Sequence, residues 1–268
     1  AWFSSQSPSA LTTAADLAVL ARPVGGCLDK PCVETFGEGG FLGFAFHPRF
    51  TQKLVVANGN RVLVWNAIPT TDFAPADLVL GQQDFVSTAP NIGGASASTL
   101  HFPQAVDSDG TRLLVADTLN HRVLVWDVFP TRIGQPATSV LGQPSFSTVT
   151  PGLFYQAWGA QLDGAGAYVA SYFTGAYHFG ALATNTAPDF SPVAATPPSR
   201  VVQDAMPHAS SVSKLAGDGL AISDPFGGRI ALQRAAGAAA SPMDATLGQP
   251  DPTREVRTGD ASGSSVRH

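Results

Sequence analysis

The residues of this chain best suited to chemistry are histidines, because an imidazole can bind a metal ion or act as a general base near neutral pH. The best placed are His47 and His101, each of which stands at an end of an apolar run of strand length. A catalytic metal needs three protein ligands that converge on one point, and spacing along a chain does not establish convergence. We therefore keep both histidines as candidate binding residues and predict no catalytic residue and no metal ligand.

The two cysteines of the chain, Cys27 and Cys32, form a C-x4-C pair around Asp29 and Pro31. A turn of this kind suits a small disulfide-closed loop in an oxidising compartment, and we predict that bond. The alternative is two unpaired buried thiols in a cytosolic protein. Structural zinc normally takes four ligands, and no second pair follows at ligand spacing, so a zinc site is not expected.

Composition excludes several function classes. The formal net charge of −5 argues against nucleic-acid binding, which needs a basic surface. No apolar run approaches the roughly 20 residues of a membrane span. The glycine-rich residues 37–43 are followed by Pro48 and alternating aromatic residues, so no helix begins there and we predict no nucleotide or other cofactor.

The chain begins with Ala1 and not with methionine, and removal of a leader would place the protein outside the cytosol. We predict a secreted, periplasmic or cell-envelope protein.

The elements that would position these side chains are short strands. Between Phe102 and Phe146, runs rich in Val, Leu and Trp alternate with turn residues such as Asp107 to Gly110 and Thr118 to His121. A meander of four strands is expected, at Gln104–Val106, Leu113–Ala116, Arg122–Trp126 and Thr138–Gly142.

The same unit recurs along the chain. VLVWNAIPTT matches VLVWDVFPTR, and VLGQ occurs twice, with TLGQ near the end. Four-stranded units repeated in this way indicate an all-β fold, a β-propeller of antiparallel blades. We predict one domain over residues 1–251, with an orphan outer strand near 14–20 and a polar tail over 252–268. The units lie near 41–85, 100–146, 152–196 and 207–251.

The second unit resembles the NHL repeat, and its VLGQ extension is similar to a bacterial variety of that repeat. The first unit keeps Asn60 and Arg61, and the fourth keeps Asp224 and Arg229, while the third has lost nearly all of the pattern. The resemblance implies a propeller that binds partners, although related six-bladed propellers include lyases and lactonases, so it does not fix the function. The matching residues of the second unit are Pro103, Asp107, Gly110, Ala116, Asp117, Asn120, His121 and Arg122.

Some of these repeated residues are expected to be architectural. Asp117 and Arg122 should form a charge-assisted hydrogen-bonded pair across their turn, and Asp224 and Arg229 should form the same pair in the fourth unit. Asn120 and His121 belong to the same turn and are expected to be structural as well.

Function in a repeat array is often carried by the copies that depart from the pattern. The third unit is such a copy, and aromatic, weakly charged residues gather in it. Aromatic surfaces of this kind are typical of binding hot spots, and the alternative is that these rings fill the core. The candidate binding residues of this unit are Trp158, Tyr172, Tyr177 and His178.

The sequence therefore predicts a binding or scaffold propeller that contacts a protein or a glycan and carries no catalytic site. Two alternatives stay open. One is a metal-dependent propeller enzyme of lyase or hydrolase type that uses His47, His101 and nearby acids. The other is a structural subunit of a larger assembly, in which a homo- or hetero-oligomer completes the propeller, because unpaired strand edges invite association.

Overall fold

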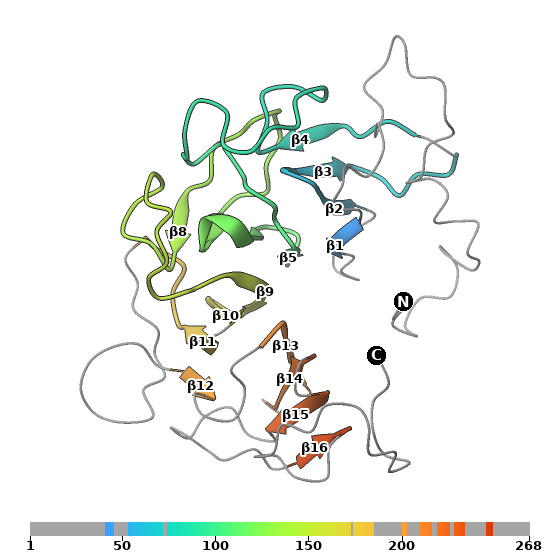
Figure 1. The fold of residues 1–268 in the computed structure, drawn as a ribbon. Coiled ribbons are helices and arrows are strands. Elements are labelled where there is room, and N and C mark those ends of the chain that lie inside the picture. The colour runs from blue at the N-terminus through green and yellow to red at the C-terminus, as the bar shows by residue number, and fades with distance from the viewer. Residues whose placement is uncertain are drawn as a thin grey trace.

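The structure is a computed structural model in which four antiparallel sheets of four strands follow one another around an arc (Figure 1). Within each sheet the strands lie in chain order, so every sheet is a simple meander. The fold is an all-β propeller, and helix among the described residues is confined to short turns such as η2 (Thr118–Asn120). The structure describes residues 41–45, 53–71, 74–172, 174–184, 200–202, 209–215, 219–225, 228–233 and 245–248.

The bounds of the strands follow the repeats. The first sheet contains β1 (Phe41–Ala45), β2 (Leu54–Asn58), β3 (Arg61–Trp65) and β4 (Leu78–Leu80). The second contains β5 (Ala105–Ser108), β6 (Leu113–Asp117), β7 (Arg122–Trp126) and β8 (Ser139–Leu141). The third contains β9 (Ala157–Asp163), β10 (Gly166–Ser171), β11 (Gly175–Phe179) and β12 (Arg200–Val202). The fourth contains β13 (Ser211–Lys214), β14 (Leu220–Asp224), β15 (Arg229–Gln233) and β16 (Ala245–Leu247).

The last strand of the third sheet, β12, lies beyond residue 196, at which the sequence placed the end of that unit. The segment near 14–20, the tail over 252–268, Cys27, Cys32 and His47 lie outside the described residues.

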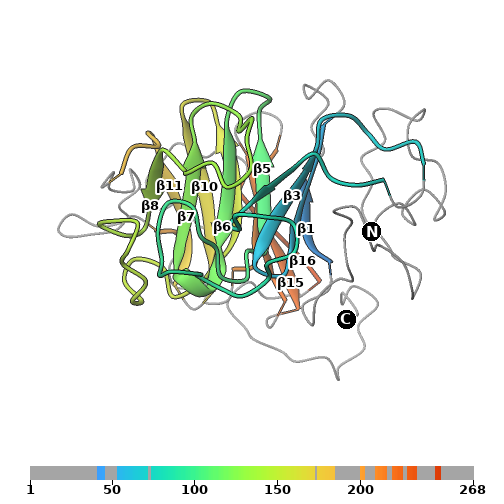
Figure 2. The same cartoon turned by 90° about the horizontal axis from the view of Figure 1, so that it is seen from above.

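Apolar layers hold neighbouring sheets face to face. Each sheet has residues on both faces in alternation, so a sheet between two others must be apolar on both sides, and β6 and β7 are buried along their whole length. One cluster joins the first and second sheets around Leu80, Leu113 and Trp126. A second cluster joins the second and third sheets, and a third cluster joins the third and fourth. Figure 2 shows the strands of these sheets standing side by side.

The outer edges of the sheets are covered by loops from the next unit. The Gly134 amide, from the loop between β7 and β8, donates to the Val79 carbonyl of β4 at 2.9 Å. The Val140 amide of β8 donates to Thr184 Oγ1 of the third unit at 3.2 Å. An exposed strand edge is a template for unwanted pairing, and these bonds occupy part of it.

Among the described residues, no helix is long and apolar enough to cross a membrane.

The Leu-Gly-Gln segment that recurs at the end of the outer strand in the first, second and fourth units is explained by close packing in the first two. Gly142 has φ +84°, and a Cβ built on it would lie 2.3 Å from the ring of Phe154. Gly81 has φ +86°, and its Cβ would lie 2.6 Å from Leu100. Only glycine fits, because the next unit places a core side chain directly against the backbone. The glutamine that follows acts as a clamp: Gln143 Nε2 donates to the carbonyls of His121 and Thr150, at 3.1 and 2.9 Å.

We predict that Gly142→Ala destabilises the protein much more than Gly164→Ala. Gly164 also has a positive φ, +57°, but a Cβ there meets nothing within 4 Å. The control should therefore lose about 1 kcal/mol from backbone strain alone, and Gly142→Ala roughly 3 kcal/mol or more, because Phe154 must also move. Urea unfolding followed by circular dichroism measures both. Equal losses for the two variants would contradict this explanation of the repeated glycine.

Candidate functional site

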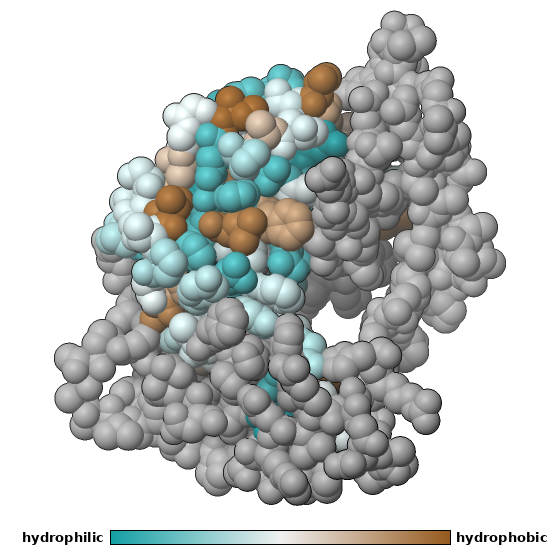
Figure 3. Space-filling view, in the orientation of Figure 1, coloured by the Kyte–Doolittle hydropathy of each residue, from teal (hydrophilic) through white to brown (hydrophobic). Residues whose placement is uncertain are grey.

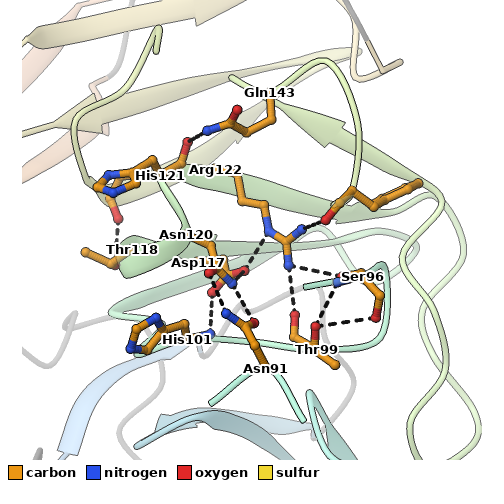
Figure 4. A network of polar contacts seen from close by, with 12 residues as sticks. Asn91, Ser96, Thr99, His101, Asp117, Thr118, Asn120, His121, Arg122 and Gln143 are labelled. Atoms are coloured by element: carbon orange, nitrogen blue, oxygen red, sulfur yellow. Dashed lines mark hydrogen bonds and ion pairs between the residues drawn. The ribbon is translucent and has the colours of Figure 1, made fainter. Parts of the chain in front are cut away.

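Meander topology brings three kinds of segment to one end of the sheets. The start of the first strand, the turn between the second and third strands and the loop after the fourth strand must all lie at the same end, because neighbouring strands run in opposite directions. In the second unit this end carries His101, η2 and Gln143 (Figure 4). We call it the η2 face. It faces the viewer in Figure 3, where the coloured residues around the centre mix hydrophobic and hydrophilic types.

A buried ion pair organises this face in the second unit. Arg122 Nε donates to Asp117 Oδ2 at 2.7 Å, and both side chains are 0% exposed. Asp117 also accepts from the His101 amide at 2.7 Å and from Asn120 Nδ2 at 2.8 Å (Figure 4). Burial raises the pKa of Asp117, and Arg122 and these hydrogen bonds oppose that rise. Three of the other four guanidinium hydrogens donate to the carbonyls of Ser96, Thr99 and Phe146.

The first and fourth units contain versions of this pair. Arg229 Nη2 lies 3.1 Å from Asp224 Oδ2, as the sequence pattern suggested. In the first unit Arg61 Nε donates to Asn58 Oδ1 at 3.1 Å, and Arg61 Nη1 donates to the Phe85 carbonyl at 2.6 Å. The arginine therefore ties the central turn to the loop after the outer strand in both of the first two units.

The third unit replaces the ion pair with a tyrosine. Ser171 and Gly175 pair in the ladder where Asp117 and Arg122 pair in the second unit. The Tyr177 hydroxyl donates to the carbonyls of Leu153 and Thr174, at 3.0 and 3.1 Å, and so links the turn to the start of the unit. Tyr177 is only 1% exposed. The structure therefore places Tyr177, a candidate binding residue of the sequence analysis, in the core, with its hydroxyl used internally.

Two other aromatic residues of the third unit lie together at the η2 face. The rings of Trp158 and Tyr172 stack, with centroids 4.9 Å apart and an interplanar angle of 16°. Trp158 Nε1 donates to Gln156 Oε1 at 3.1 Å, and the Tyr172 amide donates to the Gln156 carbonyl at 2.9 Å. The register of β9 shifts at Trp158, since Ala170 pairs with Gly159 but Ser171 pairs with Ala157. This β-bulge re-aims the indole, a use of bulges that is frequent beside functional sites.

The second unit adds a strained pair, His101 and Phe102, to this face. Phe102 has φ +53°, which is rare for a bulky residue and signals strain that the surroundings must maintain. Its amide donates to Asn60 Oδ1 at 2.9 Å, and the His101 carbonyl accepts from the Leu119 amide at 3.1 Å. The turn between β2 and β3 and the η2 turn therefore hold these two residues in place.

His121 occupies a position at which glycine would be easier. Its φ is +55°, and Gly228, which also directly precedes an arginine of the ion-pair motif, has φ +60° in the fourth unit. The His121 ring lies 5.5 Å from that of Tyr155, which is 41% exposed. Its Nδ1 is enclosed and has no hydrogen-bond partner among the described residues. Burial lowers the pKa of His121, and the neighbouring charge of His101 lowers it further.

These residues form the candidate site, which we call the η2-face site. It was expected in part, since the sequence analysis named His101, Trp158 and Tyr172 as candidate binding residues. Phe102 and Tyr155 were missed, and only the loss of the repeat pattern before β9 hinted at Tyr155. The site consists of His101, Trp158, Tyr172, Phe102, His121 and Tyr155.

His178 does not belong to this site. Its Nε2 lies 3.3 Å from Asp163 Oδ2, and its ring centroid lies 4.5 Å from that of Tyr168. Asp163 ends β9, so this contact lies at the opposite end of the sheet from Tyr172. His178 directly follows Tyr177 in the sequence, but the two side chains point to opposite faces of the sheet, because side chains alternate along a strand. In the described part of the chain, no group of three His, Cys, Asp or Glu residues is arranged to hold a metal ion.

Comparisons with known proteins identify no family for this chain. No family model matches the chain, and no curated protein matches it. Similar solved structures include a nidogen–laminin complex, with 14% identity, a TM-score of 0.44 and 73% of this chain covered. They also include a humanized mutant of the Chaetomium thermophilum Polycomb Repressive Complex 2, with 15% identity, a TM-score of 0.47 and 83% of this chain covered. The β-propeller domain of Cps50 (Swd1) from Myceliophteria thermophila has 14% identity and a TM-score of 0.45, with 75% of this chain covered.

These similarities cover less than two thirds of the matched chains, namely 60%, 44% and 55% of their lengths. They carry no argument about a partner. The assignment of the fold rests on the four sheets of this chain, and the function has to be argued from the η2-face site.

We predict that Arg122→Met destabilises the protein far more than Arg112→Met. Arg112 pairs with Asp109 at 2.5 Å, but both side chains are partly exposed, 21% and 28%, so that pair should contribute less than about 1 kcal/mol. Removing Arg122 leaves the buried Asp117 carboxylate uncompensated, which typically costs about 3–5 kcal/mol. Urea unfolding of both variants measures the difference. Similar losses would mean that the buried pair does not organise this unit.

Proposed function

We propose that this protein is a non-catalytic propeller that binds a protein partner through the η2-face site. The observation that carries the proposal is the departure of the third unit from the repeat. There Tyr177 takes over the linking task of the arginine, and the bulge at Trp158 turns an indole onto Tyr172. The second and fourth units stabilise the corresponding turn with a buried ion pair. Stability alone therefore does not require a different arrangement in the third unit.

The chemistry of the site supports a protein partner. Partly exposed Tyr and Trp side chains on a rigid scaffold are typical anchors of protein interfaces, because they supply large contact areas at low entropic cost. Trp158 and Tyr172 each use one ring face against the other, which leaves less open ring surface for a stacked sugar than two separate platforms would. We therefore favour a protein over a glycan.

Strain at the site points the same way. A non-glycine residue in the left-handed region costs about 1–2 kcal/mol, and the η2-face site contains two, Phe102 and His121. Such outliers cluster at functional sites, where surrounding contacts maintain them. Asn60 and Asp117 accept hydrogen bonds from the Phe102 and His101 amides, and Gln143 donates one to the His121 carbonyl, which supplies those contacts.

The family and the location belong to this proposal too. The NHL-type pattern of the second unit, an extracytosolic location and a Cys27–Cys32 disulfide fit a binding propeller of the cell envelope. The alternative of a metal-dependent enzyme depends on His47, which lies outside the described residues. No observation in the described part of the chain favours that alternative, and we propose no second function.

Photo-crosslinking in extracts of the source cells tests the proposal. A benzophenone amino acid replaces Tyr155 in one variant and Val128 in a control. Val128 is 68% exposed and follows β7, so it lies at the opposite end of the sheets. We expect one polypeptide to crosslink from position 155 and not from position 128. Trp158→Ala in the first variant should reduce the yield about tenfold, the loss of a hot spot of about 1.4 kcal/mol.

Two outcomes would contradict the proposal. Crosslinking of the same mixture from both positions, or of no polypeptide from position 155, would mean that the η2 face is not a docking surface. Near-ultraviolet circular dichroism of each variant checks that the fold is kept.

A further inference from the structure

Charge is nearly absent from the exposed part of the η2-face site. The carboxylates beneath it, Asp117 and Asp224, are buried and paired with arginines. Two partly exposed ion pairs in the described residues, Asp109–Arg112 and Asp163–Lys214, lie at the opposite end, near the turns that follow β5 and β9. At the η2 end, Asp84 is exposed in the loop after β4, where Ser87 and the Val86 amide bind it. None of the six described residues of the η2-face site carries a carboxylate, an ammonium or a guanidinium group.

The environment of His121 fixes which nitrogen carries its hydrogen. Nδ1 is enclosed and has no acceptor within reach among the described residues. A hydrogen on that atom would be a buried donor without a partner, which costs about 1–3 kcal/mol. The neutral ring therefore carries its hydrogen on Nε2. Because the backbone carbonyl of His121 is clamped by Gln143, the ring is a positioned donor beside Tyr155.

From this geometry we infer the chemistry of the partner: an uncharged polypeptide segment that places a carbonyl oxygen on the His121 Nε2 hydrogen and an apolar side chain against Tyr155, and that is released in acid. This inference rests on the proposed function, since it names the segment that the η2-face site takes. It adds the charge of that segment and the direction of its pH dependence.

The sign of the pH dependence follows from proton linkage. Burial already lowers the pKa of His121 in the free protein, with a further contribution from His101. An uncharged segment laid over the ring buries it further and lowers that pKa again. Binding therefore releases a proton whenever free His121 is protonated, and the affinity is full above the free pKa. Below it, the affinity falls about tenfold per pH unit, in proportion to the neutral fraction.

The groups around His121 do not offset this effect. Asp117, which precedes η2, is held by Arg122, and Arg122 itself is buried and always charged. His101, which precedes β5, is a second imidazole whose charge lowers the pKa of His121 and so does not favour its protonation. Tyr155, which precedes β9, presents an aromatic ring to His121. Acid therefore places positive charge on a face with no free carboxylate beside it in the described residues.

Binding of defined peptides tests the inference directly. The probes are three acetylated and amidated pentapeptides, Gly-Leu-Xaa-Leu-Gly, in which Xaa is Phe, Asp or Lys. Nuclear magnetic resonance of the labelled protein follows the Trp158 indole and the His121 ring. We expect the Phe peptide to shift both signals at pH 7.5 and to bind more weakly as the pH is lowered stepwise to 5. The Asp and Lys peptides should bind at least tenfold more weakly than the Phe peptide at pH 7.5.

Two variants separate titration from folding. His121→Asn keeps a residue that tolerates φ near +55° and removes the titrating ring, so it should bind the Phe peptide more weakly and lose most of the pH dependence. His178→Gln, at the other end of the third sheet, should keep both affinity and pH dependence. Unchanged pH dependence in His121→Asn overturns the inference.

Two results with the peptides would also overturn the inference. Binding of the Asp or Lys peptide as tightly as the Phe peptide, or no binding of any peptide, overturns the uncharged-segment inference. Neither result bears on the crosslink from position 155, which tests the proposed function separately.

Discussion

The structure depends on one buried cation more than on any other group. Arg122 is enclosed by protein on all sides, and a guanidinium in such a place must have an anion and an acceptor for each of its hydrogens. Asp117 supplies the anion, and backbone carbonyls of the loops before and after supply the acceptors. Those loops belong to different segments of the chain, so one side chain fixes the turn, the start of the unit and the loop after the outer strand. The repeat pattern of aspartate, asparagine and arginine follows from that requirement.

The glycine and glutamine of the outer strand extend the same constraint to the next unit. Gly142 lets Phe154 lie against the backbone, and Gln143 holds the carbonyl of His121. Thr118 completes the connection, because its hydroxyl donates to the Ala157 carbonyl of β9 at 2.6 Å. The second and third units are thus joined through the η2 face itself. Any side chain displayed there inherits the rigidity of the core, which is what a binding site on a repeat scaffold requires.

The sequence predicted the regular parts well and the irregular parts poorly, for a physical reason. Strands such as Leu113–Asp117 and Arg122–Trp126 follow from apolar runs and turn residues, which are local signals. The pair of Asp117 with Arg122 follows from repetition. In the third unit these signals are absent, so the roles of its aromatic residues depend on register. The bulge at Trp158 and the inward position of Tyr177 are set by pairing with β10 and by the packing of neighbouring sheets, which no local pattern encodes.

His121 shows how a residue of the repeat can serve both architecture and binding. If only the turn mattered, glycine would be preferred at φ +55°, and Gly228 shows that the fold accepts it before an arginine of the same motif. A histidine there carries backbone strain and leaves Nδ1 without a partner in the described residues. Neither feature helps the turn, since Gln143 binds only the backbone carbonyl. What the imidazole adds is a ring beside the exposed Tyr155 and a hydrogen on Nε2, and both are useful only to something that lies on the η2 face.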